Sequence, residues 1–224
     1  MEVATPALDA RELYRFYHIG DDETLALRGV SVEVRHGEIV AVVGPSGSGK
    51  STLLHCLAGL DEPDGGYVAV NGTRLTRRGD RMRAALRAQS IGILLQSGNL
   101  FDHLTVAQNV ELKMRLAGMR DPSRVRVVLE LVGIAARHSA YPQQLSGGEA
   151  SRAGLAVALA PEPAVLLADE PTGEVDSDTE ARILALFDAH RAHGGAALIV
   201  SHSAEVASRA DRIVRLLDGR IVDG

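Results

Sequence analysis

Short hydrophobic runs alternate with longer stretches of helical periodicity along most of the chain. Residues 39–43 form a continuous apolar run rich in β-branched side chains, and residues 165–168 and 197–200 have the same character. Such runs predict strands buried on both faces, as in the middle of a parallel sheet. Helices are expected over residues 50–60, 106–116, 124–132, 149–160 and 178–191. This alternation predicts an α/β domain built around a mainly parallel sheet.

The first third of the chain departs from this pattern. Residues 31–35 and 67–70 are short segments of alternating polarity, and a Gly-Gly pair and an Asn-Gly pair flank the second of them. Turn residues of this kind connect antiparallel strands. We therefore expect a small N-terminal antiparallel β flank on the main sheet.

A glycine-rich loop follows the first buried run. Residues 44–51 fit the pattern G-x-x-x-x-G-K-[ST] and stand between a predicted strand and a predicted helix, which is the setting of a phosphate-binding loop (P-loop). Glycines let backbone amides wrap a phosphate, and the helix N-terminus adds partial positive charge. Lys50 supplies a full charge to the outer phosphates, and Ser51 offers a hydroxyl to Mg²⁺. The predicted nucleotide site comprises Gly44, Pro45, Ser46, Gly47, Ser48, Gly49, Lys50, Ser51 and Thr52.

Two carboxylates follow the apolar run at residues 165–168. Asp169 can hold Mg²⁺ directly or through water, and Glu170 can polarise a water for in-line attack on the γ-phosphorus. Neighbouring acids at a strand end could also be solvated turn residues, but beside a P-loop we favour the catalytic interpretation. These features predict a P-loop NTPase core without choosing among GTPases, kinases and ATP-driven motors.

A second anion site is predicted at the start of the helix near residue 149. Ser146, Gly147, Gly148 and Glu149 combine a hydroxyl, two unobstructed amides and a helix N-terminus. One nucleotide does not need two such sites. Two chains arranged head to tail do, because each second site then covers the ATP held by the other chain. We therefore expect a homodimer that forms when ATP binds, with these four residues acting in trans.

Together with the P-loop and the carboxylate pair, residues 145–149 resemble the signature motif of the ATP-binding-cassette (ABC) ATPases, usually written LSGGQ. The resemblance covers nearly the whole chain, and it is closest to bacterial ATPases for lipoprotein release and macrolide export. It implies one ABC ATPase domain over residues 1–224, with an inserted helical subdomain at roughly 97–155. It also implies Mg²⁺-dependent ATP hydrolysis coupled to a separate membrane permease, with export or membrane extraction favoured.

The resemblance assigns roles to further residues. Gln96 matches the Q-loop glutamine, which contacts Mg²⁺ and water, and Asp176 matches the D-loop aspartate, which acts across the dimer. His202 matches the switch histidine near the γ-phosphate. Tyr17 resembles the aromatic residue that stacks on adenine, although Tyr14 and Phe16 compete for this role. The expected catalytic set is then Glu170, His202, Gln96 and Lys50, and the expected metal ligands are Ser51, Gln96 and Asp169.

Composition limits the partners. The formal net charge of −5 argues against a nucleic-acid binder, which needs a basic face. The single cysteine, Cys56, excludes an intramolecular disulfide and suits a reducing compartment. No apolar run reaches about 18 residues, the length that spans a bilayer. We expect a cytoplasmic protein at the inner face of the cell membrane, which touches the membrane only through its permease.

Several positions depart from the family's pattern. Val157 stands where an arginine is common, Gly98 where a bulky aromatic is common, and Glu174 and Val175 replace the usual D-loop residues. Gly154 inside a helix costs about 1 kcal/mol relative to alanine. These changes lie on the expected dimer contact and Q-loop surface, and they leave the residues expected to hydrolyse ATP in place.

Two other functions remain open from the sequence. A soluble ABC ATPase that serves no transporter would share these motifs, as would a nucleotide-binding regulator with weak turnover. The carboxylate of Glu170 and the imidazole of His202 favour hydrolysis over a regulator. A small-molecule kinase is disfavoured because a phosphoryl acceptor site does not explain residues 145–149.

Overall fold

The computed structural model describes residues 5–19, 22–173 and 175–223. Its strands are β1 Leu8–Ile19, β2 Asp22–Val34, β3 Ile39–Val43, β4 Gly65–Val70, β5 Thr73–Arg74, β6 Ile91–Leu94, β7 Val165–Asp169, β8 Ala196–Val200, β9 Arg212–Leu217 and β10 Arg220–Asp223. Its α-helices are α1 Lys50–Leu57, α2 Asp80–Ser90, α3 Val106–Leu116, α4 Pro122–Leu131, α5 Gly147–Leu159, α6 Ser177–Ala192 and α7 Ala204–Arg209. Short 3₁₀ turns occupy Ala135–Arg137 and Pro142–Gln144.

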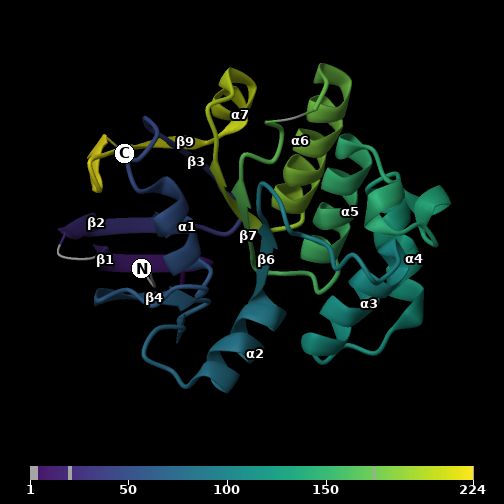
Figure 1. Ribbon diagram of the computed structural model, residues 1–224, viewed down its shortest axis with the longest axis horizontal. Coiled ribbons are helices and arrows are strands. Elements are labelled where there is room, and N and C mark those ends of the chain that lie inside the picture. The colour runs from purple at the N-terminus through teal and green to yellow at the C-terminus, as the bar shows by residue number, and fades with distance from the viewer. Residues whose placement is uncertain (1–4, 20–21, 174, 224) are drawn as a thin grey trace.

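The strands form two sheets within this described part of the chain (Figure 1). The larger has six strands in the order β10-β9-β3-β8-β7-β6, and all neighbours are parallel except β10, which runs antiparallel to β9. The smaller sheet has the order β2-β1-β4-β5 and is antiparallel. The expectation of an α/β fold with a mainly parallel sheet is confirmed.

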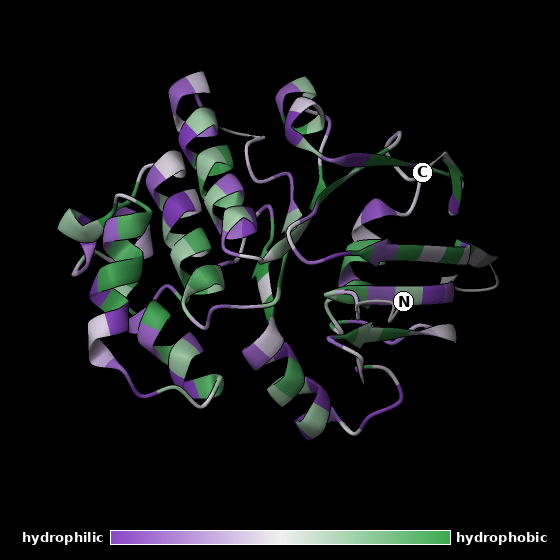
Figure 2. Ribbon diagram, turned by 180° about the vertical axis from the view of Figure 1, so that it is seen from behind, coloured by the Kyte–Doolittle hydropathy of each residue, from purple (hydrophilic) through white to green (hydrophobic). Residues whose placement is uncertain are grey.

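Strand β3 shows why its residues are apolar without interruption. Val40 and Val42 belong to one buried cluster, whereas Ile39 and Ala41 belong to another on the opposite face of the sheet. Successive side chains of a strand point to opposite faces, so a strand covered on both sides buries every residue. Figure 2 shows the central strands as largely hydrophobic.

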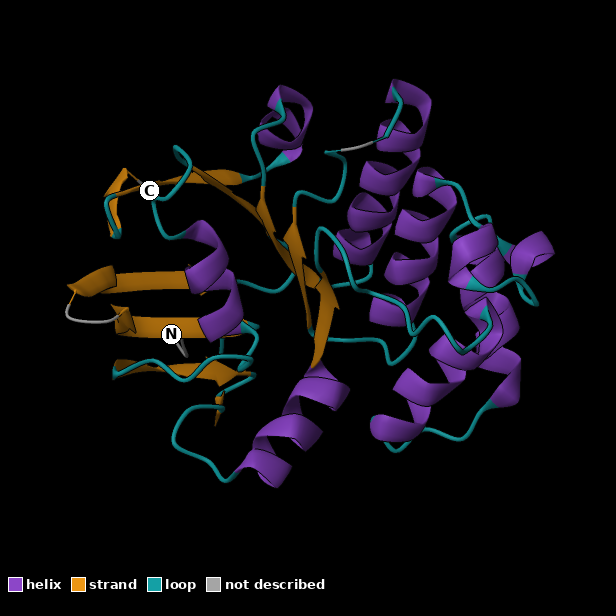
Figure 3. Cartoon of the chain, viewed as in Figure 1, coloured by secondary structure: helices purple, strands orange, loops and turns teal. Residues whose placement is uncertain are grey.

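The two faces of the large sheet are covered by different elements. One cluster joins the sheet to α1 and the antiparallel sheet, through Leu53, Leu54, Leu8 and Leu13 among others. The other joins it to α3, α4, α5 and α6. Figure 3 shows the central strands of the large sheet in the middle of the molecule, with α1 and the antiparallel sheet on one side and α3, α4 and α5 on the other. None of the helices in the described ranges is long and apolar enough to cross a bilayer.

Most predicted helices and strands are present near their predicted positions, and β3 and α3 have the predicted bounds. Helix α1 ends at Leu57 rather than at residue 60, since Gly59 takes a positive φ of 63° that breaks the helix. The antiparallel flank is a sheet of its own, and β1 and β2 span 12 and 13 residues. Register shifts between Ala10 and Leu13 and near Tyr14 interrupt the alternation of β1, which hid this strand from the hydrophobic pattern.

Candidate functional site

The P-loop joins β3 to α1 and lines a cavity of about 1080 Å³. Gly47 and Gly49 have φ angles of 77° and 101°, in the left-handed region that favours glycine. A Cβ atom on Gly49 would lie 2.5 Å from the carbonyl oxygen of Ala26, whereas a Cβ on Gly47 would meet no atom within 4 Å. The loop is therefore packed against β2 on one side and open on the other, where a phosphate group fits.

Lys50 is held in the wall of this cavity. Its ammonium group donates hydrogen bonds to the carbonyl oxygens of Gly44 (2.8 Å) and Pro45 (2.9 Å). An ammonium has three donors, so these bonds orient the group and leave one donor for an anionic ligand. The charge lies beside the N-terminus of α1, which itself favours anions.

A hydroxyl and a carboxylate meet beside the loop. The Oγ atom of Ser51, at the start of α1, donates to Oδ2 of Asp169 at the end of β7 over 3.0 Å. Gln96 follows β6 and lines the same cavity. These side chains present hard oxygen atoms of the kind that Mg²⁺ prefers, so the residues fit this ion.

Glu170 occupies a strained position directly after β7, the strand that ends at Asp169. Its φ is 46°, in the left-handed region, and its N–H donates to the carbonyl oxygen of Val200 over 2.9 Å. Its Oε2 accepts hydrogen bonds from Ser201 Oγ (2.9 Å) and from the backbone N–H of His202 (3.3 Å). Its Oε1 is buried and lies 3.6 Å from Nε2 of His202, whose side chain is 60% exposed. The strained backbone at Glu170 thus accompanies a carboxylate that points to His202, two residues after the end of β8.

Tyr17 lines the cavity, whereas Tyr14 and Phe16 do not. Its hydroxyl donates to Asp61 Oδ2 over 2.9 Å, and the guanidinium carbon of Arg15 lies 4.7 Å from its ring centroid. Burial raises the pKa of this hydroxyl. Its place in the cavity wall therefore distinguishes Tyr17 from Tyr14 and Phe16 as the candidate for base stacking.

The predicted second anion site lies outside this cavity. Ser146 caps α5: its Oγ accepts from the N–H of Glu149 (3.3 Å), and Oε2 of Glu149 accepts from the N–H of Ser146 (2.9 Å). The bond from Ser146 and the ion pair with Arg137 at 2.9 Å hold the pKa of the Glu149 carboxyl below its usual value. Gly147 lines an adjoining groove of about 430 Å³, which shares Gln96 and Glu170 with the P-loop cavity.

Asp176 also stays apart from the cavity. It caps α6 by accepting from the backbone N–H of Thr179 over 2.9 Å, and this bond lowers the pKa of its carboxyl. The neighbouring D-loop residue Glu174 lies outside the described residues. One chain therefore holds the P-loop and the signature segment in different places.

The structure brings together eleven of the predicted site residues around the cavity. They are Tyr17, Ser46, Gly47, Gly49, Lys50, Ser51, Thr52, Gln96, Asp169, Glu170 and His202. Sequence reasoning missed several other residues that line it, among them Thr172, Glu180, Ser201, Ser203 and Asp218. Ser201 could have been found from its position beside His202, whereas Glu180 carries no motif signal.

The chain is similar to known proteins along almost its full length. Residues 27–173 match the family described as ABC transporter. An uncharacterized ABC transporter ATP-binding protein of Thermotoga maritima is 46% identical over 94% of this chain and 91% of its own length. The lipoprotein-releasing system ATP-binding protein LolD of Maricaulis maris is 44% identical over 96% of this chain and 94% of its own. A dimeric structure of the ATP-binding cassette MJ0796, in a post-hydrolysis state with ADP and Pi, has a TM-score of 0.90 and 32% identity, covering 96% of this chain and 97% of that one.

Proposed function

Because this chain belongs to the ABC transporter family, we propose that it hydrolyses ATP in an ATP-bound homodimer that drives a separate membrane permease. Export or extraction from the membrane is the favoured direction, since LolD is named for lipoprotein release. The chain would then work in the cytoplasm, at the inner face of the cell membrane, and reach the bilayer only through its permease.

One observation carries the hydrolytic part of this proposal. A single cavity gathers the phosphate-binding loop, the Ser51–Asp169 pair and the Glu170–His202 pair. These groups come from α1 and from the ends of β7 and β8 or the residues just after them, which are far apart in the sequence and adjacent in space. Phosphoryl transfer to water needs hydrogen-bond donors that bind the phosphates, ligands for the metal ion, and a base that activates the water.

Each residue has a task in this scheme. The loop amides and Lys50 bind the β- and γ-phosphates, and Tyr17 stacks on the adenine. Ser51, Asp169 and Gln96 would hold Mg²⁺, which neutralises charge on the phosphates when bound. Glu170 accepts the proton of the attacking water.

His202 completes the site from the neighbouring strand. Its exposed ring can donate a hydrogen bond to the γ-phosphate, so it senses whether that group is present. Its backbone N–H orients the Glu170 carboxylate at the same time. The two residues would therefore act as a unit.

The dimer follows from the separation of the two anion sites. Ser146, Gly147, Gly148 and Glu149 of one chain would cover the γ-phosphate on the P-loop of the other, with Asp176 at the same contact. ATP would then favour the closed dimer, because only a triphosphate bridges both sites. The helical subdomain at roughly 97–155 would pass the movement to the permease.

A two-part experiment tests the proposal on the full chain. Phosphate release from MgATP should be measured for the wild type and for Glu170→Gln, with a fall of about 10²–10⁴-fold expected on losing the general base. Light scattering should show Glu170→Gln as a dimer with ATP and a monomer with ADP. Adding Ser146→Arg to that variant should abolish the dimer.

Two results would count against the proposal. If Glu170→Gln released phosphate as fast as the wild type, Glu170 would not be the general base. If Glu170→Gln stayed monomeric with ATP bound, the proposed ATP-bound dimer would be wrong. The permease part is tested separately by co-purification of the full chain with a candidate permease from membranes, where absence of a complex would favour a non-transport ATPase.

A further inference from the structure

Glu180 lies on α6 within one helical turn of Asp176, and its N–H donates to the carbonyl oxygen of Asp176 over 2.8 Å. Its side chain reaches the wall of the P-loop cavity. Neither the P-loop nor the signature pattern accounts for a carboxylate at this position.

One oxygen of this carboxylate joins two segments of the chain. Oε1 accepts a hydrogen bond from Thr172 Oγ1 over 3.1 Å and another from Ser203 Oγ over 2.8 Å. Thr172 follows Glu170 by two residues, and Ser203 follows His202 directly. The contact therefore fastens the segment after β7 to the segment after β8, beside Glu170 and His202, which lie in these segments.

The link continues to Glu170 itself. The N–H of Ser203 donates to Ser201 Oγ over 3.1 Å, and that hydroxyl donates to Glu170 Oε2 over 2.9 Å. Hydrogen-bonded side chains of this kind restrict one another's rotamers, so a change at one end moves the other. Glu180 is thus connected to Glu170 through Ser203 and Ser201.

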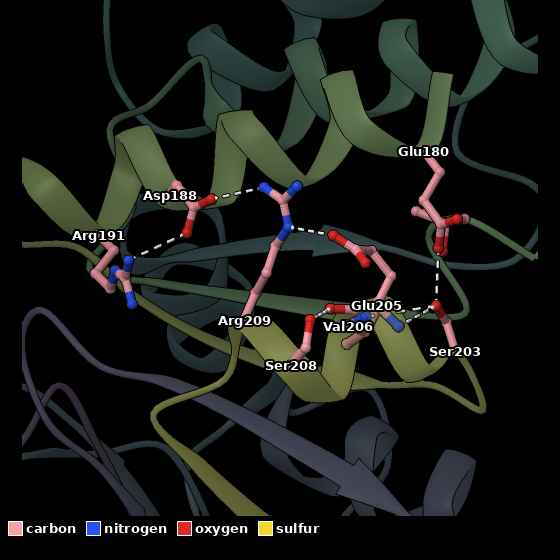
Figure 4. A network of polar contacts seen from close by, with 9 residues as sticks. Glu180, Asp188, Arg191, Ser203, Glu205, Val206, Ser208 and Arg209 are labelled. Atoms are coloured by element: carbon pink, nitrogen blue, oxygen red, sulfur yellow. Dashed lines mark hydrogen bonds and ion pairs between the residues drawn. The ribbon is translucent and has the colours of Figure 1, made fainter. Parts of the chain in front are cut away.

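Helix α7 is held on α6 along its length, which keeps Ser203 in place. Figure 4 shows Glu180 pointing from α6 to Ser203, with Arg209 of α7 farther along between Glu205 and Asp188. Arg209 binds Asp188 over 2.9 Å. Of these contacts between the two helices, the Glu180–Ser203 bond lies nearest the cavity, which both residues line.

We propose that Glu180 is a positioning residue for ATP hydrolysis, which sets Glu170 and His202 relative to each other by tying Thr172 to Ser203. The inference rests on the proposed function, because it concerns the hydrolytic step. Since Glu180 acts through its neighbours, its loss should slow turnover and leave nucleotide affinity nearly unchanged. Because both bonds end on one acceptor oxygen, a carbonyl oxygen in the same place can accept both, and the negative charge is not required.

The test compares Glu180→Ala with Glu180→Gln by steady-state ATPase assays on the full chain. Glu180→Ala should lower kcat about tenfold and change KM less than threefold, the size expected for the loss of one or two hydrogen bonds that act on the transition state. Glu180→Gln should restore kcat to within about twofold of the wild type, because its carbonyl oxygen keeps both bonds. Arg209→Ala, which loosens α7 at the other end, should lower the melting temperature and leave kcat near the wild-type value.

Three outcomes would overturn the inference. The first is unchanged kcat in Glu180→Ala. The second is an equal loss in Glu180→Gln, which would assign the effect to charge. The third is an equal loss in Arg209→Ala, which would assign it to anchoring of α7. A wild type that releases no phosphate would instead refute the proposed function.

Discussion

Gly154 gives a quantitative test of how tightly α5 packs against the segment after β6. A Cβ atom at this position would lie 2.9 Å from Cβ of Asn99 and 2.9 Å from Cδ1 of Leu94. Carbon atoms in favourable contact are about 3.5–4.0 Å apart. The Leu94 methyl group can rotate away, but Asn99 is fixed, since its side chain accepts from the N–H of Leu95 (2.7 Å) and donates to the carbonyl oxygen of Leu95 (2.6 Å).

Two opposing effects determine how much Gly154→Ala changes the free energy of unfolding. Helix propensity alone would stabilise the protein by about 1 kcal/mol. Overpacking costs about 1–3 kcal/mol, so the variant should be less stable than the wild type by about 0–2 kcal/mol. Urea unfolding followed by circular dichroism measures this difference.

The matched control is Ala185→Gly at an exposed position inside α6. It should lose about 1 kcal/mol and so calibrates helix propensity in this protein. If Gly154→Ala were more stable than the wild type by a similar amount, the close approach of α5 to Asn99 would be refuted.

Three other substitutions test contacts elsewhere. Tyr17→Ala should weaken ATP binding roughly fivefold to 150-fold, because base stacking contributes about 1–3 kcal/mol. Tyr17→Phe should bind like the wild type in a fluorescence titration, and equal binding by the alanine variant would contradict stacking. Asp176→Ala should lower the midpoint of urea unfolding, since it removes the cap of α6. That difference should shrink as the pH falls through the lowered pKa of this carboxyl, because protonation weakens its bonds from Thr179; a constant difference would contradict the cap. Burial lowers the pKa of Lys113 to about 8. Since an unfolded lysine has a pKa of about 10.4, the folded chain loses this proton first, and wild-type stability relative to Lys113→Met should rise between these pH values. A pH-independent difference in urea unfolding would contradict the lowered pKa of Lys113.

The parts of the fold that were predictable are those whose residues carry a local pattern. Strand β3 is apolar throughout because both of its faces are buried, and α3 begins at a capping box made by Thr105 and Gln108. The P-loop was recognisable because its glycines are needed at fixed spacing. Helix α2 lies in an arginine-rich stretch whose sequence favours a solvated, partly helical surface, and none of its residues is buried, so no core-facing pattern identified it.

The parts that were missed depend on contacts between distant segments. Glu180 and Ser203 are 23 positions apart and meet only because α6 and α7 pack together. Gly154 looked like a weak point in a helix, and its reason became visible only with Asn99 beside it. The catalytic and binding roles assigned to single residues remain predictions, because they concern a nucleotide and a second chain.

The place of β3 in the sheet has a consequence for synthesis on the ribosome. This strand pairs with β8 and β9, and the N–H of Gly219 donates to the carbonyl oxygen of Ser48 in the loop that follows β3 (3.0 Å). After the loop that follows β3 has been synthesised, synthesis of β8 and β9 takes a further time on the order of 10–30 s, at about 5–20 residues per second. Until then the most hydrophobic strand of the nascent chain is unpaired, and a chain arrested before residue 196 should retain no ATP. Nucleotide capture would thus report that translation is nearly complete.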